Sequence, residues 1–220
     1  MLKYGKDPVF DPETRHFLNI DRQSLSLIPR GSYVLDIGCA TGFMGEYLKK
    51  KKNCTVVGVE MGHEEAQIAQ KKLQKVIKGD IENPDTLKKI SGKFDIILAS
   101  AIVEHLHDPE TALKTWRKFL KEDGHIIITI PNIAHWSTRL HVLMGRFNYQ
   151  EYGILDKTHL HFYTIETFQT LVTNAGYNIE TLLIDPVGGG FPKISLLLSR
   201  FFPGLFAYQM VIKAQVDKPS

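Results

Sequence analysis

The amino-acid sequence predicts an α/β protein with a doubly wound, mostly parallel sheet. Apolar stretches with the length of strands alternate with stretches of helical period along residues 33–130. The strand-like stretches are nearly continuous apolar runs, which is typical of parallel strands covered on both faces. With 220 residues, the chain is long enough for one well-packed domain and short for two separate cores. We therefore expect a single domain over residues 1–220.

Five strands with intervening helices are expected in the first 130 residues. Residues 1–30 contain a lead-in helix at 17–28, where an apolar helical period ends before Pro29 and Gly31. Another helix begins at Asp108, which precedes Pro109 and Glu110; Leu113, Trp116 and Leu120 share one face, and Glu122-Asp123-Gly124 ends it. The other expected helices are residues 42–50, 64–73 and 84–90. The expected strands, joined by right-handed crossovers, are residues 33–37, 54–60, 76–79, 94–100 and 125–130.

The second part of the chain departs from this alternation. Residues 132–163 are rich in His, Trp, Arg and Tyr and lack a clean period, so we expect an insertion or lid over the ligand-binding edge. Thr164 is expected to cap a helix over residues 164–175 that Gly176 ends. The last strands, residues 178–184 and 206–214, are expected to form an antiparallel pair at the sheet edge. Between them lie a glycine run at 188–190 and a helical stretch at 193–201.

Composition indicates a soluble, folded protein in a reducing compartment. The chain is 43% hydrophobic and 23% charged, and its net charge of +3 forms no concentrated basic stretch that would indicate a nucleic-acid partner. The lysines at 49–52 end a helix and are expected to be solvated. Cys39 and Cys54 are the only cysteines, which excludes a disulfide framework and favours the cytoplasm. We expect neither a signal peptide nor a transmembrane segment.

A ligand site is expected where the first strands end. Gly38, Ala40 and Gly42 form a tight turn between the first strand and its helix, and Asp36 precedes this turn. Acids also follow the next two strands, at Glu60 and Asp80, and such ends meet at one edge of a parallel sheet. An acid at position 36 would repel a pyrophosphate and suits a cationic nucleoside such as S-adenosylmethionine. A turn that binds no ligand is the alternative.

These segments resemble those of the class I S-adenosylmethionine-dependent methyltransferases. The resemblance rests on VLDIGCATGF, VVGVE, KGDIE, FDIILASAIVEHLHDPETAL and GHIIITIPN, with Ala40 in place of the family's middle glycine. It implies a Rossmann-like, seven-stranded sheet with an antiparallel last strand, and S-adenosylmethionine as cofactor. The implied contacts are Asp36, Gly38, Ala40 and Gly42 with the methionine part, Glu60 with the ribose, Met61 with a face of adenine, Asp80 and Ile81 with its edge, and Ala99 and Ser100 on the sulfonium side.

The dipeptide Glu104-His105 provides the candidate catalytic groups. It resembles the same dipeptide in the quinone-biosynthesis O-methyltransferases and lies near the end of the fourth strand. Transfer to an oxygen or nitrogen needs a base that removes a proton, so His105 is the first candidate and Glu104 could orient it. The alternative is a structural histidine that binds the backbone, with Glu104 in solvent.

Residues 132–163 are expected to shape the acceptor pocket. The pattern PN-HW-R-G followed by THLHFYT resembles the methionine-biosynthesis accessory protein MetW and methyltransferase-like proteins encoded with cell-surface glycan enzymes. His159 and His161 would face one way in an extended segment, but further metal ligands are not apparent, so we expect no metal. A polar-aromatic lid is the alternative. The candidate lining residues are His135, Trp136, Arg139, His159, His161 and Tyr163.

The sequence thus predicts methyl transfer from S-adenosylmethionine to an oxygen of a small-molecule, glycan-type or lipid-linked acceptor. Two alternatives stay open: a methyltransferase-like accessory protein that binds the nucleoside without turnover, and an NAD-dependent oxidoreductase. Neither the acceptor nor the oligomeric state follows from these motifs, because insertions rather than the fold determine the substrate.

Overall fold

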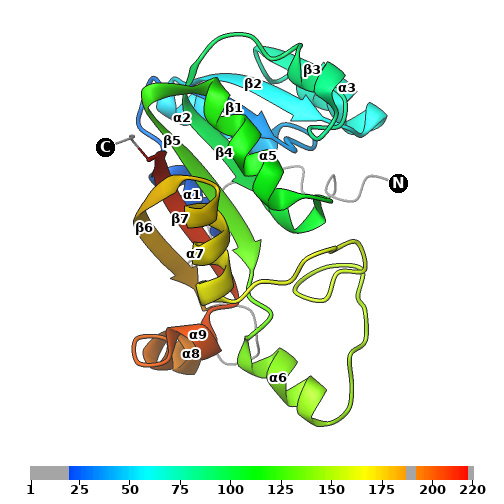
Figure 1. Cartoon of the computed structure of the whole chain (residues 1–220), viewed down its shortest axis with the longest axis vertical. Helices are drawn as coiled ribbons and strands as arrows, with labels where there is room; N and C mark the ends of the chain where they lie inside the picture. Colours follow the sequence, from blue (N-terminus) through cyan, green and yellow to red (C-terminus); the bar gives the residue numbers. More distant parts are fainter. Residues whose placement is uncertain (1–19, 187–191, 218–220) are drawn as a thin grey trace.

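A computed structural model describes residues 20–186 and 192–217, and its seven-stranded sheet confirms the predicted fold class (Figure 1). The strand order is β3-β2-β1-β4-β5-β7-β6. The five strands β1 to β5 run parallel to one another, whereas β7 pairs antiparallel with both of its neighbours, β5 and β6. The strands are β1 (Tyr33–Ile37), β2 (Thr55–Glu60), β3 (Lys75–Lys78), β4 (Phe94–Ser100), β5 (Leu120–Pro131), β6 (Tyr177–Asp185) and β7 (Gln209–Val216).

Helices cover both faces of the sheet. Along β1, Val34 faces one core and Leu35 and Ile37 face the other, as the two-residue period of a strand requires. The first core packs under α1 (Ile20–Ser26), α2 (Phe43–Lys52) and α3 (His63–Gln70). The second packs under α5 (Pro109–Trp116) and α7 (Ile165–Asn174) and holds the buried Trp116 and Phe168. The shorter helices are α4 (Pro84–Leu87), α6 (Trp136–Leu143), α8 (Pro192–Leu198), α9 (Pro203–Phe206), η1 (Val103–His105) and η2 (Arg117–Phe119).

The predicted caps form. The Asp108 carboxylate accepts a hydrogen bond from the Thr111 N–H at 3.0 Å and begins α5. Thr164 and Thr167 form a reciprocal capping box at the start of α7. Both cysteines are buried and free. Of the expected lead-in helix, residues 17–19 lie outside the described residues, as do the glycines at 188–190.

Several predicted boundaries differ from the structure: the helices expected over residues 64–73 and 84–90 end at Gln70 and Leu87. At two further places the type of element is wrong. The helix after Asp108 ends at Trp116, and Leu120 begins β5 instead of completing a helix face. The cause is strand pairing: Leu120 lies opposite Phe94, and a register shift before Ile96 accommodates the residues up to Gly124. Likewise, Phe206 belongs to α9, and β7 begins only at Gln209. Strand β7 lies between β5 and β6, so the edge strand of the antiparallel pair is β6.

Residues 132–163 leave the carboxyl end of β5, form α6, and return through a long loop to α7 (Figure 1). Isolated bridges join Asn132 to Tyr163 and Gln150 to Asp156. The Asn132 side chain donates to the carbonyls of Gly204 and Ala207 at 3.0 and 2.8 Å. These bonds hold the base of the segment against α9. The expected insertion therefore contains a helix that its composition did not reveal.

Candidate functional site

The glycine-rich turn after β1 is held by the carboxylate of Glu60. Gly38, Ala40 and Gly42 all have positive φ angles, of 70°, 47° and 73°. The Ala40 N–H donates to Glu60 Oε2 at 2.8 Å, and the Gly62 N–H donates to Oε1 at 2.7 Å. The acid that ends β2 thus fixes the turn after β1 and the turn into α3. Together the two turns make a rigid cradle with an acidic wall.

Asp36 places a second acid beneath this cradle. The side chain is buried, and its Oδ2 atom has no hydrogen-bond partner within the described residues. Burial, and to a lesser extent the charge of Glu60, raise the pKa of Asp36 to about 7. A buried acid without a partner is costly and gains free energy when a cation pairs with it. The residues present therefore fit a cofactor that carries positive charge.

The other predicted cofactor residues surround the same sheet edge. Met61 is 70% exposed, Asp80 is exposed, and Ile81 beside it is buried. The Asp80 carboxylate accepts from the Glu82 N–H at 2.9 Å, which fixes its orientation. Ala99 is buried at the end of β4, and the Ser100 hydroxyl lies 3.0 Å from that of Thr129. An exposed apolar side chain next to an oriented acid suits an adenine ring at this edge.

Ala40 occupies a left-handed conformation that favours glycine. A Cβ atom at this φ costs about 1 kcal/mol, and a glycine relieves it at a smaller entropic cost in the unfolded chain. We expect Ala40→Gly to raise the free energy of unfolding by about 0.5 kcal/mol in urea denaturation. Ala66→Gly, in the right-handed helix α3, is the matched control and should lower it by about 1 kcal/mol. A loss of stability in Ala40→Gly would contradict this account.

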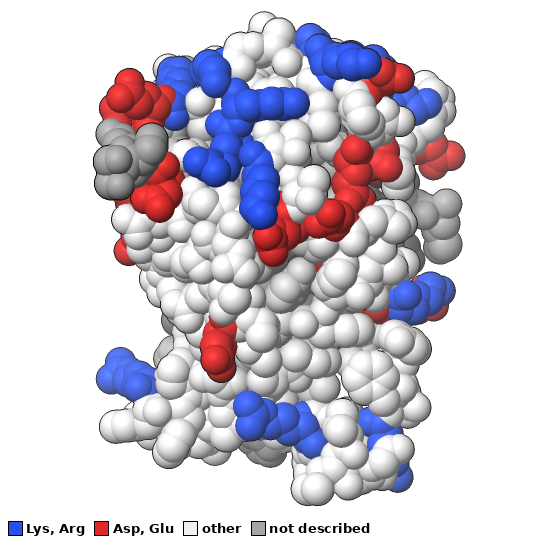
Figure 2. Space-filling model, viewed as in Figure 1, with Lys and Arg blue, Asp and Glu red and all other residues white. Residues whose placement is uncertain are grey.

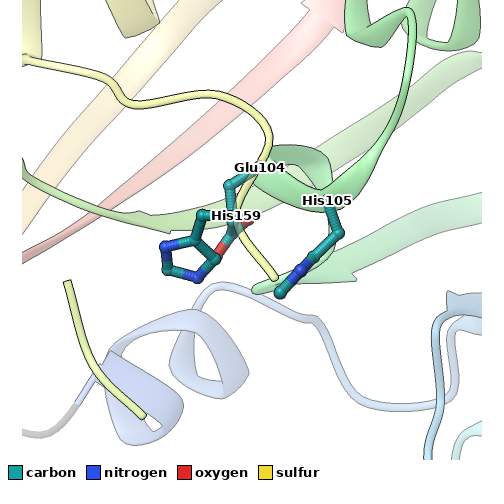
Figure 3. A group of neighbouring side chains, drawn as sticks. All are labelled: Glu104, His105 and His159. Atoms are coloured by element: carbon teal, nitrogen blue, oxygen red, sulfur yellow. The ribbon is translucent and has the colours of Figure 1, made fainter. Parts of the chain in front are cut away.

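Glu104, His105 and His159 form a compact group beside the end of β4 (Figure 3). Glu104 and His105 belong to η1, and His159 comes from the loop after α6. One ligand-type atom from each lies within 4.8 Å of the others, and the two imidazole rings meet edge to face with centroids 4.8 Å apart. Backbone bonds from Leu160 and His161 to the Glu104 carbonyl, at 2.9 and 3.1 Å, hold the loop against η1.

Hydrogen bonds orient both imidazoles. His105 Nδ1 lies 3.0 Å from the Thr158 carbonyl, and His159 Nδ1 lies 3.1 Å from the Ile154 carbonyl. A carbonyl can only accept, so each neutral ring has its proton on Nδ1 and its basic lone pair on Nε2. His159 Nε2 lies 3.9 Å from Glu104 Oε1. Burial, followed by the charge of Asp156, raises the pKa of Glu104 to about 8, so its buried carboxyl is largely protonated at pH 7.

This group can perform two kinds of chemistry. Two imidazoles and a carboxyl can pass a proton, and the same atoms match the ligands that Zn²⁺ takes in proteins. Histidines that donate Nδ1–H to a carbonyl are also oriented as metal ligands commonly are. The predicted absence of a metal is therefore a question for experiment.

The structure changes two expectations for these residues. His159 and His161 do not serve one site: His159 faces Glu104, whereas His161 Nε2 lies 3.3 Å from the His107 carbonyl and its ring stacks near Tyr163. For His105, the orienting bond comes from the carbonyl of Thr158. The Thr158 N–H and hydroxyl donate to Asp156 Oδ1 at 2.8 and 2.7 Å, a turn that its Asp-Lys-Thr spacing could have indicated.

The remaining predicted acceptor residues lie at the start of α6. His135 is buried, accepts from the Ser137 N–H, and contacts the Tyr208 ring edge to face. Burial lowers the pKa of His135 to about 4, so the ring is neutral. Within the described chain, His135 Nε2 and Trp136 Nε1 are buried without hydrogen-bond partners. Arg139 is exposed and donates to the Ala134 carbonyl at 2.7 Å. The start of α6 therefore carries two buried ring nitrogens without hydrogen-bond partners among the described residues.

Comparison with known proteins points to one family. A family model described as a methyltransferase domain matches residues 13–182. The mitochondrial ubiquinone biosynthesis O-methyltransferase of Bos taurus is 30% identical over 172 residues, which are 72% of this chain and 45% of that protein. The ubiquinone biosynthesis O-methyltransferase of Coxiella burnetii is 28% identical over 119 residues, 53% of this chain and 50% of the other. The chain thus spans about half the length of these curated relatives.

Solved structures share the fold at low sequence identity. A SAM-dependent methyltransferase from Thermotoga maritima has a TM-score of 0.63 and 23% identity, covering 89% of this chain and 86% of its own. Magnesium protoporphyrin IX methyltransferase from Synechocystis, solved with bound SAH, has a TM-score of 0.59 and 15% identity, covering 86% and 75%. These likenesses support the class I methyltransferase architecture. They do not extend to the insertion's predicted likeness to MetW.

Proposed function

Since the chain belongs to the S-adenosylmethionine-dependent methyltransferases, we propose that it transfers the cofactor's methyl group to an oxygen of a small-molecule, glycan-type or lipid-linked acceptor. The observation that carries this proposal is Asp36, a buried acid beneath the cradle that Glu60 holds, whose Oδ2 atom has no hydrogen-bond partner within the described residues. A cationic cofactor suits this charge, whereas a dinucleotide pyrophosphate would be repelled. The cofactor, when bound, supplies an electrophilic methyl group.

Each candidate site residue then has a defined role. Asp36 attracts positive charge, and Glu60 accepts hydrogen bonds from ribose hydroxyls through the lone pairs that Ala40 and Gly62 leave. Met61, Asp80 and Ile81 enclose the adenine ring of the cofactor, and Ala99 and Ser100 flank its sulfonium end. His105 accepts the proton of the acceptor hydroxyl at Nε2 while Thr158 holds Nδ1. His135 and Trp136 orient the acceptor, with Arg139 and His159 along its pocket. His161 and Tyr163, whose rings stack, would support the loop that carries His159.

The names of the relatives favour oxygen as the acceptor atom. The bovine and Coxiella proteins are O-methyltransferases of ubiquinone biosynthesis, and the stretch with Glu104 and His105 resembles theirs. A neutral His135 is also suited to donate a hydrogen bond to an uncharged oxygen. Because the chain spans about half of those relatives, their place in ubiquinone biosynthesis is a guide to the class of acceptor only.

Calorimetric titration with S-adenosylmethionine, its demethylated product and NAD tests the cofactor. We expect micromolar binding of the first two and none of NAD. Preferential binding of NAD would make the protein an oxidoreductase. A labelled-methyl screen against pooled metabolites, glycan and lipid extracts then tests turnover, and a labelled product identifies the acceptor and its methylated atom. Binding of the cofactor together with a stable protein complex and no labelled product would instead indicate an accessory role.

Metal removal distinguishes the two chemistries of the group formed by Glu104, His105 and His159. Because the proposed proton transfer uses no ion, we expect turnover to survive EDTA treatment followed by gel filtration with less than about a twofold change. If EDTA abolished turnover and added Zn²⁺ or Mg²⁺ restored it, the group would hold a cation. The residual turnover of the Glu104→Gln variant should then not respond to EDTA or to added metal. Metal content of the purified protein, measured by mass spectrometry, provides the second readout.

A further inference from the structure

Two helices at one end of the molecule present their apolar side chains to solvent and their small polar side chains to the protein. In α6 the buried residue is Thr138, whereas Leu143 is 84% exposed. In and just after α8, Ser195 and Ser199 are 2% and 7% exposed, whereas Leu197 is 59% exposed. A surface helix in water normally has the opposite orientation. The exposed faces of both helices are therefore suited to contact with an apolar environment outside the protein.

Exposed apolar side chains concentrate around these helices. Of fourteen large hydrophobic residues exposed in the described part of the chain, thirteen lie in residues 140–160 and 194–202, and the other is Met61. We call residues 139–160 and 193–202 together the apolar end. The Asn132 bonds to the Gly204 and Ala207 carbonyls place the base of α6 beside α9, so the two segments belong to one region. Its exposed members are Leu140, Val142, Leu143, Met144, Phe147, Tyr149, Tyr152, Leu160, Ile194, Leu196, Leu197, Phe201 and Phe202.

The apolar end carries more positive than negative charge. It carries five lysines and arginines, and its acids are Glu151, which pairs with Lys157 at 2.6 Å, and the buried Asp156. Figure 2 shows this end as mostly white, with blue side chains scattered over it and little red, whereas the opposite end mixes both signs. Arg139, Arg146, Lys193 and Arg200 form no ion pair with a carboxylate of the described residues, whereas Lys157 does.

We propose that the apolar end docks the protein on the surface of a lipid bilayer that contains anionic headgroups. Exposed apolar side chains enter the boundary between headgroups and acyl chains, while the cations contact phosphates. A second copy of the chain fits less well, because two such ends would bring at least eight unpaired cations together. No helix in the described ranges has the length and apolar character to cross a membrane, so the contact is peripheral.

This docking brings the acceptor residues close to the bilayer. His135 and Trp136 begin α6, and His159 follows the same loop that carries Phe147, Tyr149 and Tyr152. If the proposed methyl transfer is correct, the acceptor is a lipid-linked hydroxyl compound that reaches the site from the membrane. Docking itself is independent of cofactor and turnover.

Vesicle sedimentation of the purified full chain tests the docking. The probes are phosphatidylcholine vesicles, alone and with about 30% phosphatidylglycerol. We expect binding to the anionic vesicles and its loss by about tenfold in 0.5 M NaCl. Leu143→Ser with Phe201→Ser should lower the partition coefficient by at least about tenfold. Arg146→Ser with Arg200→Ser should lower it about 30-fold, since each cation contributes about 1 kcal/mol at such a surface.

The control is Lys51→Ser with Lys89→Ser, which makes the same change in net charge at exposed positions outside the apolar end. It should bind vesicles within about twofold of the wild type. Equal loss in the control, or a wild-type protein that stays in the supernatant with both vesicles, would overturn the proposal. The proposal would also be overturned if the protein bound no vesicles and formed a dimer in analytical ultracentrifugation that the double variant Leu143→Ser with Phe201→Ser dissociates. Calorimetry with S-adenosylmethionine on the same samples reports separately on the proposed function.

Discussion

Replacing Asp36 by Asn is expected to weaken the binding of S-adenosylmethionine by about 10- to 100-fold and, at pH 8, to stabilise the protein without cofactor. The affinity falls because a charge-assisted contact is worth about 1.5–3 kcal/mol and Asn provides no charge. The stability rises because Asn has the same shape and removes a buried charge whose Oδ2 atom has no hydrogen-bond partner within the described residues. Isothermal titration calorimetry and thermal unfolding measure the two effects.

The pH dependence of the second effect has a definite sign. Burial, with the charge of Glu60, raises the pKa of Asp36 from 3.8 to about 7 in the folded protein. The folded state then binds more protons than the unfolded state between these values, so stability falls as the pH rises from about 4 through 7. At about 1.4 kcal/mol per pKa unit, the wild type loses roughly 4 kcal/mol by pH 8 through this group. Asp36→Asn lacks that loss, and its unfolding temperature at pH 8 should exceed the wild type's by about 5 °C or more.

Asp95→Asn is the matched control. Asp95 lies at the other end of the sheet, where its carboxylate accepts from the Tyr33 N–H at 2.8 Å and pairs with Lys121 at 2.7 Å. This variant should keep the cofactor affinity of the wild type within about twofold and lose about 1 kcal/mol of stability. If Asp36→Asn bound S-adenosylmethionine as tightly as the wild type, Asp36 would have only a structural role, and the central support for the proposed function would be lost.

The parts of the fold that local patterns describe were predictable from sequence. The buried strands of the parallel sheet, the Asp108 and Thr164 caps, and the acids at the strand ends each depend on residues within a few positions of one another. The boundary at Leu120 was not predictable in this way. Leu113, Trp116 and Leu120 do fit a helix face, but pairing of Leu120 with Phe94 across the sheet outweighs that period.

The candidate site divides along the same line. Glu60 was placed at the turn after β1 because both belong to neighbouring parallel strand ends. The meeting of His159 with Glu104 and His105 depends on a loop that returns over more than fifty residues, and no local spacing encodes it. The exposure of the leucines in α6 and α8 could not be predicted either, because it also depends on tertiary structure. No helix was expected at α6, and residues 193–201 were expected only to be helical; the tertiary structure is what shows that Thr138 and Ser195 face inward.

Replacing His105 by Asn is expected to lower kcat about 100-fold or more while the affinity for S-adenosylmethionine changes less than about twofold. Asn is the informative substitution because its amide N–H₂ occupies the place of imidazole Nδ1 and can still donate to the Thr158 carbonyl. The loop contact is then retained, and the basic nitrogen is removed. Turnover with the acceptor from the labelled-methyl screen, measured over pH 6–9, is the readout.

His125→Gln is the control for this substitution. His125 lies at the start of the parallel part of β5, pairs with Glu180 at 3.1 Å, and is remote from the strand ends that form the site. Its kcat should match the wild type. If His105 only shapes the loop, His105→Asn will turn over at the wild-type rate with an unchanged pH profile, and the base must be sought elsewhere. Glu104→Gln tests whether Glu104 itself takes part in proton transfer. Burial raises the pKa of Glu104 to about 8, so its participation would add a step near that pH to the pH profile of the wild type, and the variant would lack this step.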